Sequence, residues 1–326
     1  MRARVVGLAV IGLGGLAIAA SATAPSWVPL TPADLRLDES SGTASDGEQV
    51  GYVDPVSLAQ VTSDDVSVSV RIRGDEDAGD ADGDTAVWES VSETGDADGT
   101  LIATATTVVC LDRRTAEAED CVVGSVDGER VEVRGLTVRF PADTERRDYD
   151  LWDTTVRESF PARYVGAERL DGLQVYRFEQ EVPEQVIRSV AVAGALVGSA
   201  EDELEAEVVH SGTTTLLVEP LSGVIVSAEA RPVTALRALD GTPGATLLSG
   251  SFRSSADAVD DAVGRARAIA GERADLQSVV RWTAAALGAA LLVLGVLLLV
   301  RLRPAQDTAR PDPAHDEPVR VPVPSA

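Results

Sequence analysis

One uninterrupted apolar run near the C-terminus constrains this chain more than any other feature. It extends from Trp282 to Val300 and contains a single hydroxyl side chain, that of Thr283. A helix needs about 20 apolar residues to cross the hydrocarbon core of a bilayer. Arginines flank the run at positions 281, 301 and 303. The pattern predicts a transmembrane helix over 282–300, which leaves the preceding residues to fold on one side of the membrane.

A second apolar segment, Val5–Ala20, lies near the N-terminus. Residues 1–24 read equally well as an uncut membrane anchor or as a signal peptide cleaved after Ala24. Either alternative exports residues 25–281. The arginine flanks then place both termini in the cytoplasm, which predicts a two-pass protein of the cytoplasmic membrane. The tail over 301–326 is Pro-rich, and we expect it to be disordered.

Charge and composition exclude several function classes. The formal net charge is −25, whereas a nucleic-acid partner requires a concentrated basic face. The chain has two histidines and two cysteines, and its sequence has no hydrolase, metalloprotease or nucleotide-binding motif. We expect no enzyme activity, no cofactor and no metal site. His210 is expected at the surface rather than as a catalytic base.

Period-two alternation of apolar and polar residues dominates 25–281, as in 66–73, 130–134, 136–140 and 173–178. It predicts a mainly β (α+β) fold of antiparallel curved sheets. A faint similarity between Thr-rich segments near 104 and 213 suggests two similar halves, divided near 135–180. The acid-rich stretch 74–100 reads as an exposed loop. Residues 186–199 read as a buried helix or loop, and 254–281 as a helix that leads into the membrane.

The two cysteines, Cys110 and Cys121, follow and precede short strand-like runs. In an exported domain such a pair is expected to be oxidised. Ten intervening residues are unlike the close spacing of redox-active CxxC pairs. We therefore expect a structural disulfide that holds a hairpin.

Seven aromatic residues gather between Gly135 and Gln180. The runs Phe140–Tyr149, Leu151–Asp153, Pro161–Gly166 and Asp171–Phe178 resemble the sequence pattern of an actinobacterial envelope family, the PorA-type porins. The resemblance covers nearly the whole chain and implies an uncut N-terminal anchor. The motif residues are expected to form a hydrophobic nucleus or to line an apolar groove. They are Phe140, Pro141, Tyr149, Trp152, Asp153, Tyr164, Gly166, Gly172, Tyr176 and Phe178.

Three functions are compatible with these features. The first is an anchored extracytoplasmic protein that binds membrane lipid or lipoglycan during envelope assembly. The second is a porin or channel component, as the family resemblance implies. The third is a scaffold for another envelope protein. A membrane barrel needs an apolar outer band, whereas charges such as Arg71 and Glu132 stand on the expected strands. For that reason we favour the lipid-binding function from the sequence alone.

Overall fold

The structure is a computed structural model that describes residues 12–13, 16–17, 19, 34–54 and 57–301. The expected N-terminal anchor over 1–24 therefore lies mostly outside the described residues, and the tail over 302–326 lies wholly outside them. Residues 29–276 form one compact unit. Residues 277–301, which continue the last helix, belong to a second unit.

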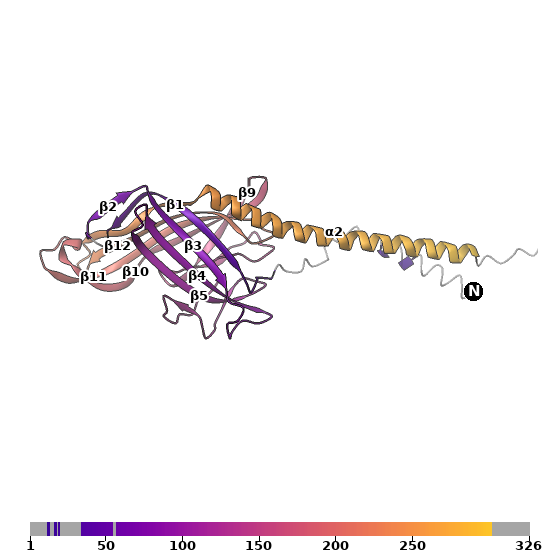
Figure 1. Cartoon of the computed structure of the whole chain (residues 1–326), viewed down its shortest axis with the longest axis horizontal. Coiled ribbons are helices and arrows are strands. Elements are labelled where there is room, and N and C mark those ends of the chain that lie inside the picture. Colours follow the sequence, from indigo (N-terminus) through magenta and orange to yellow (C-terminus); the bar gives the residue numbers. More distant parts are fainter. Residues whose placement is uncertain (1–11, 14–15, 18, 20–33, 55–56, 302–326) are drawn as a thin grey trace, which may run out of the picture. The chain divides into compact units, whose positions relative to one another are not determined.

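A single antiparallel sheet of 13 strands makes up the compact unit and curls into a half-barrel (Figure 1). Its order is β6-β5-β4-β3-β1-β13-β12-β11-β10-β9-β8, with β2 beside β1 and β7 beside β5. The first long strand thus pairs with the last one. The strands are β1 (Ser40–Val53), β2 (Gln60–Ser63), β3 (Val66–Gly74), β4 (Thr85–Asp96), β5 (Leu101–Asp112), β6 (Ala118–Glu119), β7 (Ser125–Val126), β8 (Tyr149–Asp153), β9 (Glu158–Leu170), β10 (Leu173–Ala193), β11 (Glu203–Val218), β12 (Ile225–Ala238) and β13 (Pro243–Ser254).

A connecting segment around Leu136 joins the two ends of the curled sheet. Leu136 forms an antiparallel bridge with Glu117 beside β6 and a parallel bridge with Leu151 on β8. The backbone N–H of Trp152 donates to the Leu136 carbonyl oxygen at 2.8 Å. The two ends of the curled sheet are thus connected through Leu136, although Leu136 itself lies in no strand. β9 pairs with β10 only as far as Gln180. Over residues 181–193, β11 is the only strand among the described residues that pairs with β10, so this part of the β10 edge is free.

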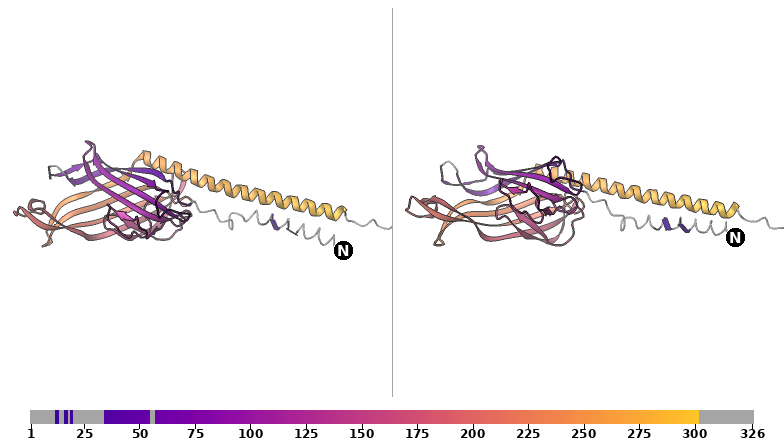
Figure 2. Two further views of the ribbon diagram at one scale, coloured as in Figure 1. Left: turned by 60° about the horizontal axis from the view of Figure 1, so that its bottom comes forward. Right: turned by 90° about the horizontal axis from the view of Figure 1, so that it is seen from below.

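Helix α2 (Ala256–Arg301) follows β13 directly. Ser255 caps its N-terminus, because its Oγ accepts from the Ala258 N–H at 3.3 Å. Ala262, Val263 and Ala266 pack against Val175 and other residues at one end of the sheet. Figure 2 shows these first turns lying along the sheet from two further sides. A helix is present where one was expected over 254–281, but it begins at Ala256 because Ser254 ends β13, and it continues without a break into the apolar run.

The fold class is confirmed as mainly β, but several details differ from the sequence prediction. The two expected halves are not seen, because the Thr-rich segments lie in β5 and β11 of one continuous sheet. The expected loop over 74–100 is wrong for its centre, which forms β4. The expected strands at 130–134 and 136–140 are instead irregular chain that carries the closing bridge. The stretch 186–199 continues β10 and ends in the short 3-10 helix η1 (Gly194–Val197) rather than an α-helix.

Candidate functional site

Aromatic residues of the sequence motif meet inside the curl. The Phe178 ring on β10 lies 4.7 Å from Phe140 and 5.8 Å from Tyr149, between ring centroids. Tyr164 on β9 lies 5.8 Å from Phe178 and 5.5 Å from Tyr176, in edge-on contacts. Phe140 and Phe178 are completely buried. These side chains form a hydrophobic nucleus, and their burial leaves Phe140 and Phe178 no surface to offer to a ligand.

The turn at 219–223 positions this nucleus. The Phe140 N–H donates to the Gly223 carbonyl oxygen at 3.0 Å. Gly223 has a φ of 72°, and a Cβ there would overlap the Phe140 carbonyl oxygen. The buried Glu219 carboxylate accepts from the Ser222 N–H at 2.8 Å and from its hydroxyl at 2.6 Å. This turn and the aromatic motif are therefore parts of one packed unit.

The other motif residues serve turns and the edge of the nucleus. Asp153 ends β8, and its Oδ1 accepts from the Thr155 and Val156 N–H groups at 2.9 and 2.8 Å. Gly172, with a φ of 82°, forms the tight turn between β9 and β10. The Pro141 carbonyl oxygen accepts from the Thr144 hydroxyl at 2.7 Å. Gly166 lies in β9 beside a bulge. Trp152 belongs to the same core cluster as Phe140.

The register of the strands identifies the inner face of the sheet. Trp88 on β4 and Phe178 on β10 belong to one core cluster, although several strands separate them in the sheet order. Both side chains therefore point into the curl, and residues two or four positions away on the same strand share that face. Residues directly opposite one another in neighbouring antiparallel strands also share a face.

Small, uncharged side chains continue the inner face beyond the nucleus. Ser92 on β4 pairs with Val70 and Ala105. Thr214 on β11 pairs with Gln180 and with Ala230. Ser92, Val70, Ala105, Thr214 and Ala230 are only half-buried, so water reaches this part of the inner face. The inner face is thus packed at one end and lined by small, uncharged groups, some of them hydroxyls, at these positions along the middle of the strands.

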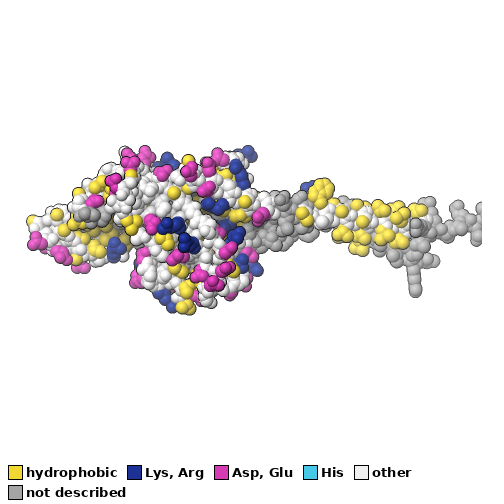
Figure 3. All heavy atoms as spheres, in the orientation of Figure 1, with side chains coloured by type: hydrophobic (Ala, Val, Ile, Leu, Met, Phe, Trp, Pro, Cys, Tyr) yellow, Lys and Arg dark blue, Asp and Glu magenta, His cyan; other side chains and the backbone are white. Residues whose placement is uncertain are grey.

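Ion pairs lie on the outer face. Arg71 and Glu93 contact at 2.9 Å across β3 and β4. Glu229 contacts Arg231 on its own strand, β12, at 2.6 Å and Arg253 on the neighbouring β13 at 3.4 Å. Figure 3 shows acidic and basic side chains over the sheet, whereas hydrophobic side chains gather along the far part of α2. Such a charged outer face is suited to water, because exposure of charges to acyl chains costs several kcal/mol.

His210 is buried on the inner face, so the expectation of a surface histidine is wrong. Its Nδ1 lies 2.8 Å from the Thr234 hydroxyl on the neighbouring strand. Burial lowers the pKa of His210, and the negative charge of Asp153 opposes that shift. Gln180 is also buried, and its amide donates to the Leu151 carbonyl oxygen at 2.7 Å. The sequence offered no signal for either residue, because their burial depends on partners from distant strands.

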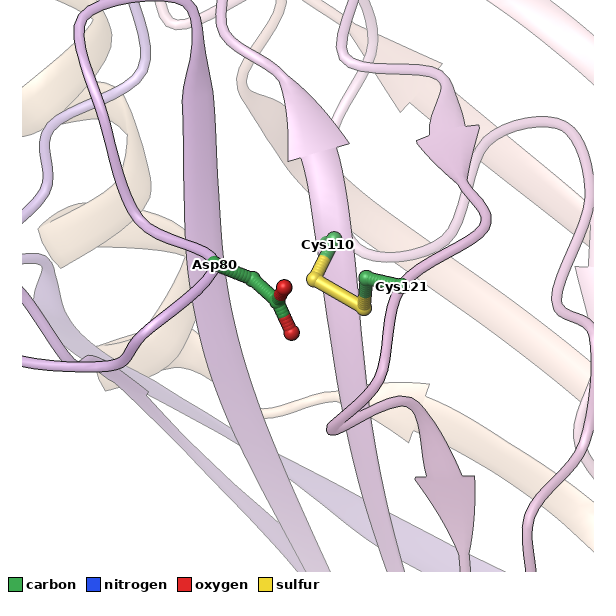
Figure 4. A group of neighbouring side chains, drawn as sticks. All are labelled: Asp80, Cys110 and Cys121. Atoms are coloured by element: carbon green, nitrogen blue, oxygen red, sulfur yellow. A yellow bond between two sulfur atoms is a disulfide. The ribbon is translucent and has the colours of Figure 1, made fainter.

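Cys110 and Cys121 form the expected disulfide. Asp80 lies beside it (Figure 4), and these three side chains have the spacing of a metal-binding group. The sulfur atoms are bonded to each other, however, and one Asp80 oxygen accepts from the Val122 and Val123 N–H groups at 3.0 and 3.2 Å. A thiolate is the form that binds a metal, so in this oxidised state the group holds two loops together rather than an ion.

Comparison with known proteins assigns the chain to a family. The family model described as Porin PorA matches residues 6–297. This chain belongs to the PorA porin family. Among curated proteins, it is 48% identical over 48 residues to a Porin PorA of Corynebacterium resistens and 24% identical over 119 residues to one of Corynebacterium amycolatum. These matches cover 15% and 28% of this chain, and they span 12% and 31% of the lengths of the two relatives.

The family assignment and the last helix together indicate membrane association. The part of α2 from Arg281 to Val300 is long and apolar enough to cross a membrane. Trp282, at its start, is 68% exposed, as befits an aromatic residue at a bilayer interface. The second span expected for a two-pass topology falls mostly on residues outside those that the structure describes.

Proposed function

We propose that this PorA-family protein is a membrane-tethered channel component of a bacterial cell envelope. In this proposal the inner face of the half-barrel lines a path for small polar solutes. Family membership over residues 6–297 carries the proposal. The half-buried hydroxyl groups of Ser92 and Thr214 on the inner face support it, because hydroxyl groups accommodate water without binding a passing ion strongly.

The distribution of charge suggests how such a channel is built. The outer face carries the ion pairs of Arg71 and Glu229, so the sheet belongs in water rather than among acyl chains. Helix α2 supplies the hydrophobic anchor over 281–300. The free β10 edge presents unpaired backbone groups, which are the usual site at which a further strand adds to a sheet. We infer that conduction requires several copies, because one half-barrel does not enclose a path along its whole length.

Planar bilayer recordings on the purified full-length chain test this proposal. Stepwise conductance from disulfide-intact protein is expected. A matched pair of variants then locates the path: Thr214→Arg places a charge on the inner face, and Thr213→Arg places it on the outer face one residue away. Thr214→Arg should shift ion selectivity towards anions, whereas Thr213→Arg should leave it unchanged.

Two results would count against this function. Folded protein without conductance would remove the channel role, and copurified lipid or lipoglycan in the same sample would favour the lipid-binding role instead. Conductance with equal selectivity in the two variants would show that solutes do not pass along the inner face.

A further inference from the structure

Two strand edges of the half-barrel are free at the same end of the sheet. On β10, residues 181–193 pair only with β11. On β5, residues 101–105 pair only with β4 among the described residues, because β6 and β7 pair with later positions. Seven antiparallel pairings separate β5 from β10 in the sheet order, so the two strands run in opposite directions. Both free stretches therefore leave the connecting segment on the same side.

The backbone of β10 presents hydrogen-bonding groups at its free edge. The Gly194 N–H donates to the Asp202 carbonyl oxygen at 3.4 Å, so residue 194 turns towards β11. The register between β10 and β11 is regular over 188–193, and the direction of hydrogen bonding alternates along an antiparallel strand. The N–H and carbonyl groups of Ser189, Ala191 and Ala193 therefore point away from β11.

The backbone of β5 presents similar groups at its own free edge. The Asp127 N–H donates to the Thr106 carbonyl oxygen at 2.7 Å, and the Asp127 carboxylate accepts from the Thr106 N–H at 2.9 Å. Thr106 thus turns away from β4. By the same alternation Thr104 also turns away from β4, and no strand among the described residues pairs with it on that side.

Neither stretch has the protection that free strand edges usually carry. Natural edges are guarded by charged residues, prolines or bulges. The beginning of the β10 edge has such guards, namely Pro183 and register shifts over 182–185 and 186–188. By contrast, residues 101–105 (Leu-Ile-Ala-Thr-Ala) and 189–193 (Ser-Val-Ala-Val-Ala) contain neither a charge nor a proline, although 25% of the chain is charged. These two stretches are suited to pair with another strand.

Apolar side chains beside both edges are only partly buried. Val190 and Val192 pack at the margin of the apolar cluster that includes Val208, and Ile102 packs at the margin of the cluster around Phe252. A strand added at either edge would cover these side chains. Apolar burial and backbone hydrogen bonds would then favour the same pairing.

We propose that two copies of this chain pair reciprocally, so that residues 189–193 of each copy add to residues 101–105 of the other. A two-fold rotation about the strand direction brings β10 of one copy beside β5 of the other and keeps the pair antiparallel. The interface is closed, because each copy offers both edges. The two half-barrels together then form one closed sheet. For its role the pairing rests on the proposed channel function, because two copies would enclose the path that one copy leaves open.

The position of α2 favours this arrangement over antiparallel pairing of β10 with the β10 of a second copy. The first turns of α2 pack at one end of the sheet. Rotation about the strand direction leaves that end on the same side in both copies, as anchoring in one membrane requires. Antiparallel β10–β10 pairing needs a two-fold axis across the strands, which would place the two helices at opposite ends.

Cysteine crosslinking in membranes tests the pairing. Two full-length chains with different affinity tags are co-expressed, one carrying Ala191→Cys and the other Thr104→Cys, both at exposed positions. A short bismaleimide should give a product that carries both tags. Thr213→Cys replaces Ala191→Cys in the control, because Thr213 is exposed but lies on the outer face of β11. Ala191→Cys alone should give little product, because the two β10 strands lie on opposite sides of the dimer.

A proline variant tests the backbone bonds themselves. Ala191→Pro removes an N–H that faces the free edge and leaves the bonds to β11 intact, whereas Ala191→Val keeps the N–H. In analytical ultracentrifugation of the purified full-length chain, Ala191→Pro should raise the dimer dissociation constant at least about tenfold. Ala191→Val should leave it nearly unchanged. Equal near-ultraviolet circular dichroism of the two variants shows that both are folded.

Three results would overturn the pairing. The first is folded protein in which Ala191→Cys with Thr104→Cys gives no more product than the control. The second is equally efficient crosslinking of Ala191→Cys to itself, which would indicate β10–β10 pairing. The third is an internal crosslink in a chain that carries both cysteines, without a product between chains, which would mean that each copy closes on itself.

Conductance of the same samples separates this inference from the proposed function. Crosslinked dimers without conductance would support the pairing and remove the channel role. Conductance from protein that gives no crosslink between chains would overturn the pairing and leave the channel role standing.

Discussion

Truncation of Phe178 tests whether the aromatic motif is the nucleus of the half-barrel. The side chain is completely buried, and its ring contacts those of Phe140, Tyr149 and Tyr164 at 4.7, 5.8 and 5.8 Å. Removing a buried phenylalanine side chain costs about 3–5 kcal/mol. Three ring contacts, each worth about 0.5–1.5 kcal/mol beyond burial, place Phe178→Ala in the upper part of that range, at about 4.5 kcal/mol. Phe178→Leu keeps most of the volume and should cost about 1.5 kcal/mol.

Urea unfolding of the full-length protein, followed by near-ultraviolet circular dichroism, measures both losses. Val186→Ala is the matched control, because Val186 lies on the same strand and is 47% exposed. It should cost less than about 0.5 kcal/mol. A loss below about 1 kcal/mol for Phe178→Ala would refute the reasoning. It would mean that β10 does not direct Phe178 into the curl, and the inner and outer faces assigned from the same register would then be wrong.

Three further predictions concern local features. Reduction of the Cys110–Cys121 bond, which closes a loop with a sequence separation of 11, should lower the unfolding free energy by about 2.5–3 kcal/mol, and calorimetry of Cys110→Ser with Cys121→Ser should give the same loss. Burial lowers the pKa of His210 below its ordinary 6.5. The unfolded chain therefore binds the extra proton first, so stability should fall as pH drops from 6.5 towards that lowered pKa, and urea midpoints should show a smaller fall for His210→Gln. Gly223→Ala should cost well over 2 kcal/mol, because its Cβ would overlap a backbone carbonyl, whereas Gly172→Ala has open space around it and should cost only the conformational strain of about 1–2 kcal/mol; equal losses in thermal unfolding would contradict the close approach at Gly223.

Local patterns in the sequence predicted the elements that depend on local interactions. The serines at 254–255 and the apolar spacing that follows indicated α2, and Ser255 caps that helix. The spacing of Cys110 and Cys121 indicated a hairpin staple, and the disulfide is present. In both cases the residues that decide the structure lie within about a dozen positions of each other along the chain.

The errors arise where pairing between distant segments decides the structure. Residues 74–100 were predicted to form a loop because the stretch as a whole is rich in acidic residues and glycines. Within it, Trp88 and its neighbours alternate as a strand between β3 and β5. The alternation at 136–140 reads as a strand, yet Leu136 joins two sheet edges that lie 19 residues before it and 15 after it. No local pattern states which edges a short segment will bridge.

The inner face of the half-barrel was hidden from the sequence for a related reason. Alternation normally distinguishes a buried apolar face from a solvated polar one. Here polar side chains occur on both faces of the middle strands: Ser92 and Thr214 point inward, while Glu93 and Thr213 point outward. Only the registers that connect Ser92 to Val70 and Thr214 to Ala230 show which side is enclosed. Because the distinction is between small neutral groups inside and ion pairs outside, a single inward charge is the perturbation most able to reveal what the enclosed face does. The comparison of Thr214→Arg with Thr213→Arg therefore distinguishes an inner face along which solutes pass from one that has only a structural role.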